Sequence, residues 1–132
     1  MQESNTRAQL SSHTILIIDD EEMIRDLARE ILEMEGYKIL CAHDGIEGIS
    51  IFKDSKEKID CIILDLTMPR MSGRETFLKL RKINSDVNII LSTGHSKDET
   101  AQEIIALGVQ GVVQKPYKIE ELIQVVQKIL NE

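Results

Sequence analysis

The chain has 132 residues, of which 42% are hydrophobic and 30% charged, as is usual for a single soluble globular domain. Its net charge of −7 repels phosphates, so we expect no direct binding to nucleic acid. No apolar run reaches the ~20 residues that cross a bilayer, and the polar N-terminus lacks the hydrophobic region of a signal peptide. The sequence therefore predicts a cytoplasmic protein and no membrane insertion of this segment.

The first half of the chain alternates between strands and helices. Residues 1–12 are predicted to be a flexible leader or the remnant of a linker, and residues 13–132 to form the domain. The β-branched run TILII at residues 14–18 predicts a buried strand. Apolar residues then recur with helical spacing until Gly36, which is placed to end that helix with a left-handed cap. A second strand, YKILCA, follows at residues 37–42.

The middle of the chain repeats this alternation. Asp44 is placed to cap a second helix, and the run CIIL at residues 61–64 predicts a third strand. Ser72 and Gly73 open a third helix, and VNIILS at residues 87–92 predicts a fourth strand. The two cysteines of the chain form no CxxC pair, and we expect both to be reduced thiols buried in strands. These are Cys41 and Cys61.

The last part adds one more strand and two helices. A fourth helix ends at Gly108, GVVQ at residues 111–114 predicts a fifth strand, and a final helix begins near Ile119. Five strands that alternate with five helices predict an α/β fold, a doubly wound parallel sheet covered on both faces. The apolar positions expected to face the sheet are Ile24, Leu27, Ala28, Ile31, Ile46, Ile49, Phe52, Phe77, Leu78, Leu80, Ala101, Ile104, Ile105, Leu107, Leu122, Ile123, Val126, Ile129 and Leu130.

Polar residues follow four of the predicted strands. Asp19 and Asp20 follow the first, Asp65 the third, Thr93 the fourth and Lys115 the fifth. Each alone has an ordinary interpretation, as a solvated strand end, a turn residue, a loop hydroxyl or a surface lysine. Together they share the carboxyl edge of one sheet, where ligands of such folds bind. Clustered carboxylates need a cation, and an all-oxygen site suits Mg²⁺, with the lysine as a point charge for a phosphate.

Four segments resemble the motifs of two-component response-regulator receiver domains. They are IIDDEE, LDLTMPRMSG, LSTGHS and QKPY, and the resemblance covers about residues 13–131. It implies the flavodoxin-like (βα)5 fold with the strand order 2-1-3-4-5. It also implies that Asp65 is the phospho-acceptor, Lys115 the phosphate-binding lysine and Thr93 the switch hydroxyl. A cis peptide bond between Lys115 and Pro116 is a further expectation.

The resemblance also implies a metal site for Mg²⁺, for which Mn²⁺ can substitute. Asp20 matches the direct ligand, Asp19 a ligand through water, and the backbone carbonyl of Thr67 a third protein ligand beside Asp65. Thr67 and His95 match positions that flank the path of the attacking water. The implied partner is a sensor histidine kinase or a histidine phosphotransfer domain. The implied chemistry is phosphoryl transfer from its phosphohistidine to the aspartate, then switching and self-dephosphorylation, with no other enzymatic turnover.

One position departs from the family pattern, and several alternatives stay open. The family commonly has an aromatic residue where this chain has Val112, so the usual threonine–aromatic coupling is not expected. A receiver-like interaction module without phosphorylation is one alternative. An aspartyl-phosphate phosphatase is another, although its usual second aspartate is here Thr67. Within the receiver interpretation, both a stand-alone regulator and the C-terminal receiver of a hybrid sensor histidine kinase remain open, and the polar leader favours the second.

Overall fold

Five parallel strands form one sheet in the computed structural model, which describes residues 13–66, 68, 71–94 and 99–130. The sheet has the order β2-β1-β3-β4-β5, which confirms the predicted fold. The strands are β1 (Thr14–Ile18), β2 (Lys38–Ala42), β3 (Cys61–Asp65), β4 (Asn88–Thr93) and β5 (Gly111–Gln114).

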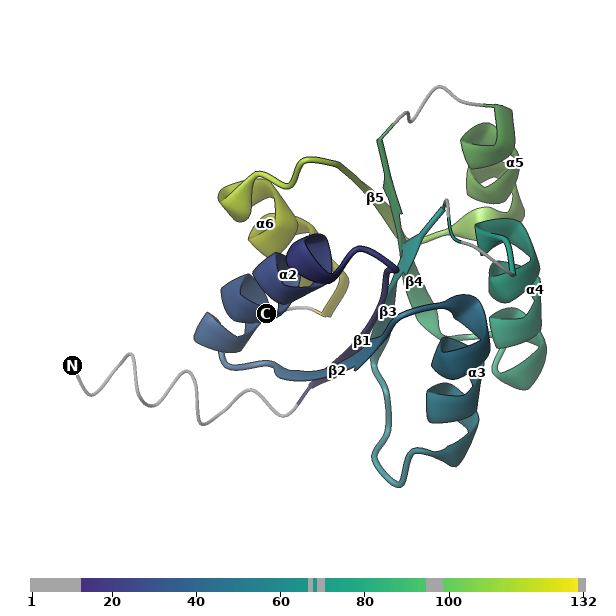
Figure 1. The fold of residues 1–132 in the computed structure, drawn as a ribbon, viewed down its shortest axis with the longest axis horizontal. Coiled ribbons are helices and arrows are strands. Elements are labelled where there is room, and N and C mark those ends of the chain that lie inside the picture. Colours follow the sequence, from purple (N-terminus) through teal and green to yellow (C-terminus); the bar gives the residue numbers. More distant parts are fainter. Residues whose placement is uncertain (1–12, 67, 69–70, 95–98, 131–132) are drawn as a thin grey trace.

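Five helices cover the two faces of the sheet (Figure 1). Helices α2 (Glu22–Met34) and α6 (Ile119–Leu130) lie on one face, and α3 (Gly45–Asp54), α4 (Gly73–Ile83) and α5 (Glu99–Gly108) lie on the other. The core is accordingly divided in two, which we call the α2/α6 core and the α3–α5 core. Ile15 and Ile17 of β1 belong to the α2/α6 core, whereas Leu16 and Ile18 belong to the α3–α5 core. All four side chains are fully buried, because successive strand residues point to opposite faces and both faces are covered.

The predicted helix ends are confirmed by their hydrogen bonds and backbone angles. The Asp44 carboxylate accepts from the backbone N–H of Glu47 at 2.8 Å, and the Ser72 hydroxyl accepts from the N–H of Glu75 at 3.1 Å. Gly36 has a φ of 93°, the left-handed conformation that ends a helix. The starts of α3 and α4 and the end of α2 therefore lie at the residues that the sequence pattern marks.

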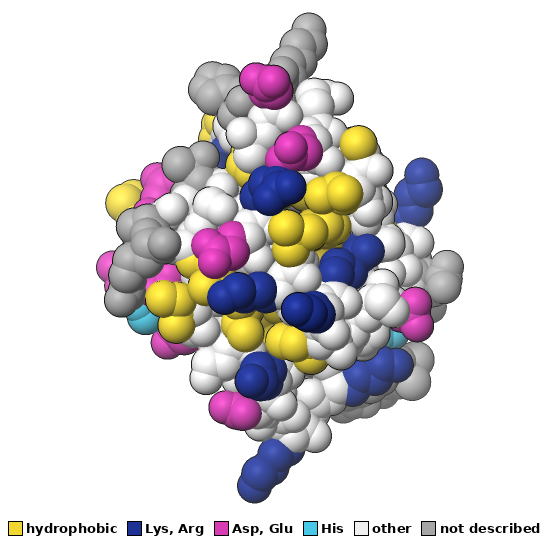
Figure 2. All heavy atoms as spheres, turned by 90° about the vertical axis from the view of Figure 1, so that its right-hand side faces the viewer, with side chains coloured by type: hydrophobic (Ala, Val, Ile, Leu, Met, Phe, Trp, Pro, Cys, Tyr) yellow, Lys and Arg dark blue, Asp and Glu magenta, His cyan; other side chains and the backbone are white. Residues whose placement is uncertain are grey.

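Several predicted core positions are instead exposed. Leu27, Ile46, Leu78 and Leu107 are 37–49% exposed, because they lie at the margins of the apolar stripes, beyond the part that the sheet covers. Figure 2 shows the face over α3, α4 and α5, where hydrophobic side chains lie among those of Lys and Arg. Conversely, Leu32, which was not among the predicted positions, is fully buried in the α2/α6 core.

The limits of three strands and the burial of one cysteine also differ from the prediction. Strand β4 begins and ends one residue later than predicted. Tyr37 is not part of β2, because its N–H bonds to the carbonyl of Leu32 in the turn that follows α2. Asp65 is the last residue of β3, not the first residue after it. Cys61 is buried as predicted, whereas Cys41 is only half-buried because β2 is an edge strand, and both thiols are free.

Candidate functional site

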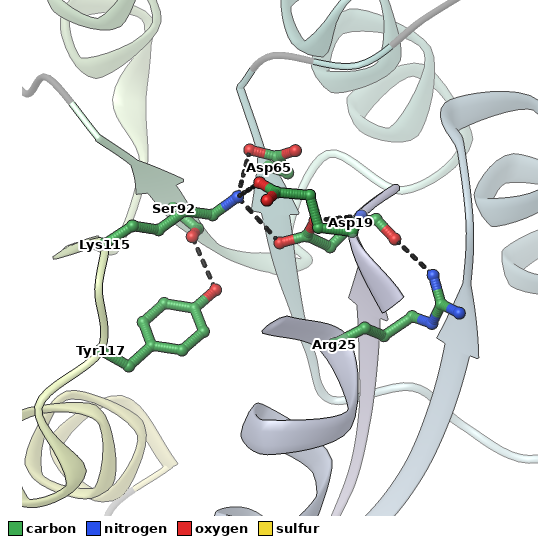
Figure 3. Close-up of polar contacts among 7 residues, drawn as sticks. Asp19, Arg25, Asp65, Ser92, Lys115 and Tyr117 are labelled. Atoms are coloured by element: carbon green, nitrogen blue, oxygen red, sulfur yellow. Dashed lines mark hydrogen bonds and ion pairs between the residues drawn. The ribbon is translucent and has the colours of Figure 1, made fainter. Parts of the chain in front are cut away.

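The sheet brings Asp19, Asp65 and Lys115 together at its carboxyl edge (Figure 3). Asp19 follows β1 and Asp65 ends β3, and these strands are neighbours at the centre of the sheet. Strands β1 and β3 flank the point where the strand order reverses, which is where ligands bind in open α/β sheets. Lys115 follows β5 and reaches past β4 to the two carboxylates.

One ammonium group forms ion pairs with several carboxylates in this site. The Lys115 Nζ atom lies 3.0 Å from Asp65 Oδ1, 3.0 Å from Asp19 Oδ2 and 3.4 Å from Glu21 Oε1. Asp19 and Asp65 are buried, with 1% and 3% of their surface exposed. Among the described residues, two buried carboxylates therefore share one cation, so negative charge exceeds positive charge in this group.

The pKa values in the site reflect this shortage of positive charge. Burial and the charge of Asp19 raise the pKa of Asp65 to about 7, although Lys115 acts in the opposite direction. Burial alone would lower the pKa of Lys115, but its hydrogen bonds to Asp19 and Asp65 outweigh burial and raise it. At neutral pH the lysine is charged and Asp65 titrates, so a further cation in the site would release a proton.

The acidic residues after β1 fit a divalent cation. Asp19, Asp20 and Glu21 each offer an oxygen, and these oxygens lie within 4.8 Å of one another. Among the described residues, Asp65 Oδ2 is buried without a hydrogen-bond partner, and Asp19 Oδ2 is buried with only the ion pair to Lys115. Buried oxygens that lack donors are suited to a cation, and an all-oxygen set fits Mg²⁺. Asp65 contributes no oxygen to the cluster of three.

Two hydrogen bonds between side chains and the backbone hold the segment that carries these carboxylates. The second carboxylate oxygen of Asp19 accepts from the N–H of Glu21 at 2.9 Å. Arg25 of α2 donates from Nη1 to the carbonyl oxygen of Asp19 at 2.8 Å, as Figure 3 shows. Glu21 and Arg25 were not predicted to belong to the site. The sequence feature that could have indicated them is the acidic run Asp-Asp-Glu-Glu after β1, followed one helical turn later by an arginine.

The structure describes some of the remaining predicted positions and leaves two of them undescribed. Thr93 ends β4, is buried, and accepts from the backbone N–H of Lys115 through its carbonyl oxygen at 2.9 Å. The peptide bond between Lys115 and Pro116 is cis, which confirms that prediction. Val112 packs against the α3–α5 core. Thr67 and His95 lie outside the described residues, so the roles expected of them stay predictions.

One hydrogen bond beside the site was not anticipated. The hydroxyl groups of Ser92 and Tyr117 lie 2.6 Å apart, directly below the lysine in Figure 3. Burial raises the pKa of Tyr117 to about 12, so the phenol stays protonated at neutral pH. A serine directly after the apolar residues 89–91 of β4 was the signal that a polar partner was needed there.

Comparison with known proteins identifies the family. A model of the response regulator receiver domain matches residues 15–127, which is most of the chain. The fold and the acidic edge of the sheet agree with this match. The chain therefore belongs to the response-regulator receiver domain family and is a receiver domain of two-component signal transduction.

Curated relatives come from two kinds of signalling protein. Response regulator MprA of Mycobacterium avium (strain 104) is 30% identical over 119 residues, 89% of this chain and 50% of that protein. Sensor kinase CckA of Brucella abortus (strain 2308) is 28% identical over 121 residues, 92% of this chain and 13% of that protein. The chain thus spans about half the length of the MprA relatives and a small part of the kinase.

Two solved receiver domain proteins share the fold over nearly their whole length. A receiver domain protein from Clostridium thermocellum is 30% identical with a TM-score of 0.83, covering 90% of this chain and 94% of that one. A CheY-like receiver domain protein from Methanospirillum hungatei JF-1 is 28% identical with a TM-score of 0.84, covering 92% and 95%. Among the described residues, no helix is long and apolar enough to cross a membrane.

Proposed function

We propose that Asp65 accepts a phosphoryl group from a phosphohistidine of a partner protein. The observation that carries this proposal is the position of Lys115 Nζ, 3.0 Å from both Asp65 and Asp19. A half-buried lysine paired with a carboxylate at the edge of the sheet is placed to hold an oxygen of a group attached to that carboxylate. Asp65 Oδ2, which is buried and has no hydrogen-bond partner among the described residues, is an oxygen on which such a bond could form.

The transfer is an in-line displacement at phosphorus. An Asp65 oxygen attacks, the bond between phosphorus and the donor imidazole nitrogen breaks, and a bond between phosphorus and the aspartate oxygen forms. Lys115 neutralises part of the charge on the transferring group. Bound Mg²⁺ would supply the remaining positive charge, held by Asp20 directly, by Asp19 through water, by Asp65 and by the carbonyl of Thr67.

The same site would then switch and reset. The Thr93 hydroxyl is proposed to move toward the phosphoryl oxygens, since Thr93 ends the strand beside Asp65. Water then hydrolyses the acyl phosphate, and this self-dephosphorylation is the only turnover that we propose. His95 and Thr67 are proposed to flank the path of that water.

The proposed phosphoryl donor is a sensor histidine kinase or a histidine phosphotransfer domain in the cytoplasm. The relatives include both a response regulator and a sensor kinase, so they support a receiver in either setting. We favour the C-terminal receiver of a hybrid kinase, with residues 1–12 as linker and residues 13–132 as the domain. The acidic net charge argues against direct contact with nucleic acid.

The test is the intact mass of the protein after treatment with acetyl phosphate and Mg²⁺. Wild type should gain one phosphoryl group, and Asp65→Asn should gain none. Asp54→Asn, which changes an exposed aspartate at the end of α3, is the matched control and should react as wild type does. Labelling of Asp65→Asn, or labelling of wild type in excess chelator, would contradict the proposal and point to another acceptor. A wild type that gains no phosphoryl group would favour the interaction module.

A further inference from the structure

Tyr117 connects the edge of the sheet to the last helix. Its hydroxyl lies 2.6 Å from that of Ser92, and its ring packs against the α2/α6 core. Ser92 is fully buried in β4, directly before Thr93. Helix α6 begins at Ile119, two residues after the tyrosine. The phenol is therefore fixed at one end by the strand and at the other by the start of a helix.

The register of the sheet places this hydrogen bond on the same face as the proposed phospho-acceptor. Asp65 and Ser92 are directly paired across β3 and β4. Ile63 and Ile90, two residues before each, both belong to the α2/α6 core. Because side chains alternate along a strand, Asp65 and Ser92 also point to that face. Val112 packs against the α3–α5 core, on the opposite face.

Two bonds hold the segment between β5 and α6 against the end of β4. The backbone N–H of Lys115 donates to the carbonyl oxygen of Thr93 at 2.9 Å, and Tyr117 bonds to Ser92 at 2.6 Å. A displacement of residues 92 and 93 should therefore move both ends of the segment 115–117. One end carries the lysine of the site, and the other leads into the first residue of α6.

We propose that Tyr117 is a positioning residue that transmits the phosphorylation state of Asp65 to α6 through its hydrogen bond with Ser92. This inference rests on the proposed function, since it takes Asp65 as the acceptor. The output of the domain is then directed to the face of α2 and α6, in place of the face on which Val112 lies.

The first test uses tyrosine fluorescence as a local probe. The chain has two tyrosines and no tryptophan, so Tyr37→Phe leaves Tyr117 as the only fluorescent residue apart from phenylalanine. In that background, acetyl phosphate and Mg²⁺ should change the emission of Tyr117. Adding Ser92→Ala should abolish the change. An equal change with and without the Ser92 hydroxyl would overturn the inference.

The second test asks whether the signal reaches the helix. Hydrogen exchange of the α6 amides should differ between the phosphorylated and unphosphorylated wild type. Tyr117→Phe should remove this difference, and the matched Tyr37→Phe, which deletes a phenol hydroxyl distant in sequence from the segment 115–117, should keep it. Ser92→Ala removes the same bond from the strand and should behave like Tyr117→Phe, which guards against misfolding of one variant.

The intact mass of each sample shows whether it is phosphorylated. It therefore separates a failure of the proposed function from a failure of the inference about Tyr117. Phosphorylated Tyr117→Phe and Ser92→Ala that both lack the α6 response support the inference. Phosphorylated variants that retain it overturn the inference and leave the proposed function standing. A wild type that gains no phosphoryl group overturns both.

Discussion

Asp19 and Asp65 compete for one lysine, and this competition governs the residue-scale behaviour of the site. Both carboxylates lie 3.0 Å from Lys115 Nζ, and among the described residues no donor hydrogen-bonds to the buried Oδ2 atom of Asp65. Removing one negative charge should remove the repulsion on the other carboxylate, and a bound divalent cation should stabilise both in their ionised form. The metal-free protein is therefore stabilised by losing the carboxylate on which its function is proposed to depend.

Without metal, Asp65→Asn should be more stable than wild type at pH 8 and close to it near pH 4. The pKa of Asp65 is raised to about 7 in the folded chain, whereas an unfolded aspartate titrates near 3.9. Between these values the folded state holds more protons, so wild-type stability falls as pH rises through this window. The expected gain at pH 8 is of the order of 2–4 kcal/mol.

Urea unfolding at several pH values in excess chelator measures this difference. Because every other acidic group is common to the two proteins, their difference isolates Asp65. A difference that stays constant from pH 4 to pH 8 would show that the charge of this aspartate is not the destabilising factor.

Asp20→Ala should weaken Mg²⁺ binding more than Asp19→Ala does. Asp20 is exposed at the mouth of the site, where it can bind the ion directly, whereas Asp19 is buried against Lys115. Loss of an outer contact commonly costs ~10–100-fold in metal affinity, and loss of a direct ligand should cost at least as much. Calorimetric titration with Mg²⁺ compares the variants, with Glu22→Gln as the control. Equal losses for the two aspartates would contradict the assigned roles.

At the scale of elements, the start of α4 holds the end of β3 in place. The N–H of Gly73 donates to the carbonyl oxygen of Leu66 at 3.1 Å, one residue beyond Asp65. A Cβ atom at position 73 would lie 2.5 Å from that oxygen and 3.0 Å from the carbonyl oxygen of Asp65. These are backbone atoms, so the strand end would have to move to accept a side chain.

Gly73→Ala should therefore destabilise the domain by about 1–3 kcal/mol and slow the labelling of Asp65. Gly94→Ala is the matched control, because a Cβ atom there would meet no heavy atom within 4 Å. The control should stay within about 0.5 kcal/mol of wild type. Thermal unfolding and intact-mass time courses of the two variants test this. Normal labelling in a destabilised Gly73→Ala would show that the acceptor position does not depend on this contact.

At the scale of the whole molecule, Mg²⁺ binding and folding should be linked. The proposed ligands come from β1 and β3, which meet only in the folded sheet, so the ion should bind the native state alone. At a free concentration 100 times the Kd, such binding adds ~2.7 kcal/mol of stability. The melting temperature should rise with Mg²⁺ in wild type and much less in Asp20→Ala.

A control with NaCl at matched ionic strength is needed, because a chain with a net charge of −7 is also stabilised by general screening. If NaCl raises the melting temperature as much as Mg²⁺ does, the effect is screening and not a specific site.

The sequence predicted the elements and the edge of the sheet, but not the contacts made across the fold. The runs at residues 14–18 and 111–114 match β1 and β5 residue for residue, because short β-branched runs between turn residues specify strands. Leu27 and Leu32 show the limit. Helical spacing marks an apolar stripe, but neighbouring elements decide which margin is covered. The bond between Ser92 and Tyr117 joins residues 25 apart, and no local pattern encodes it.

The separation of the site residues along the chain also determines the order in which they are added during translation. Lys115 lies 50 residues after Asp65, and it follows the last strand of the sheet. A ribosome adds residues at ~5–20 per second, so the nascent chain carries Asp65 for roughly 3–10 s before its lysine exists. During that interval neither the edge strand β5 nor the counterion is available. If Asp65 is the acceptor as proposed, competence to receive a phosphoryl group should therefore arise only late in translation, once Lys115 has been added.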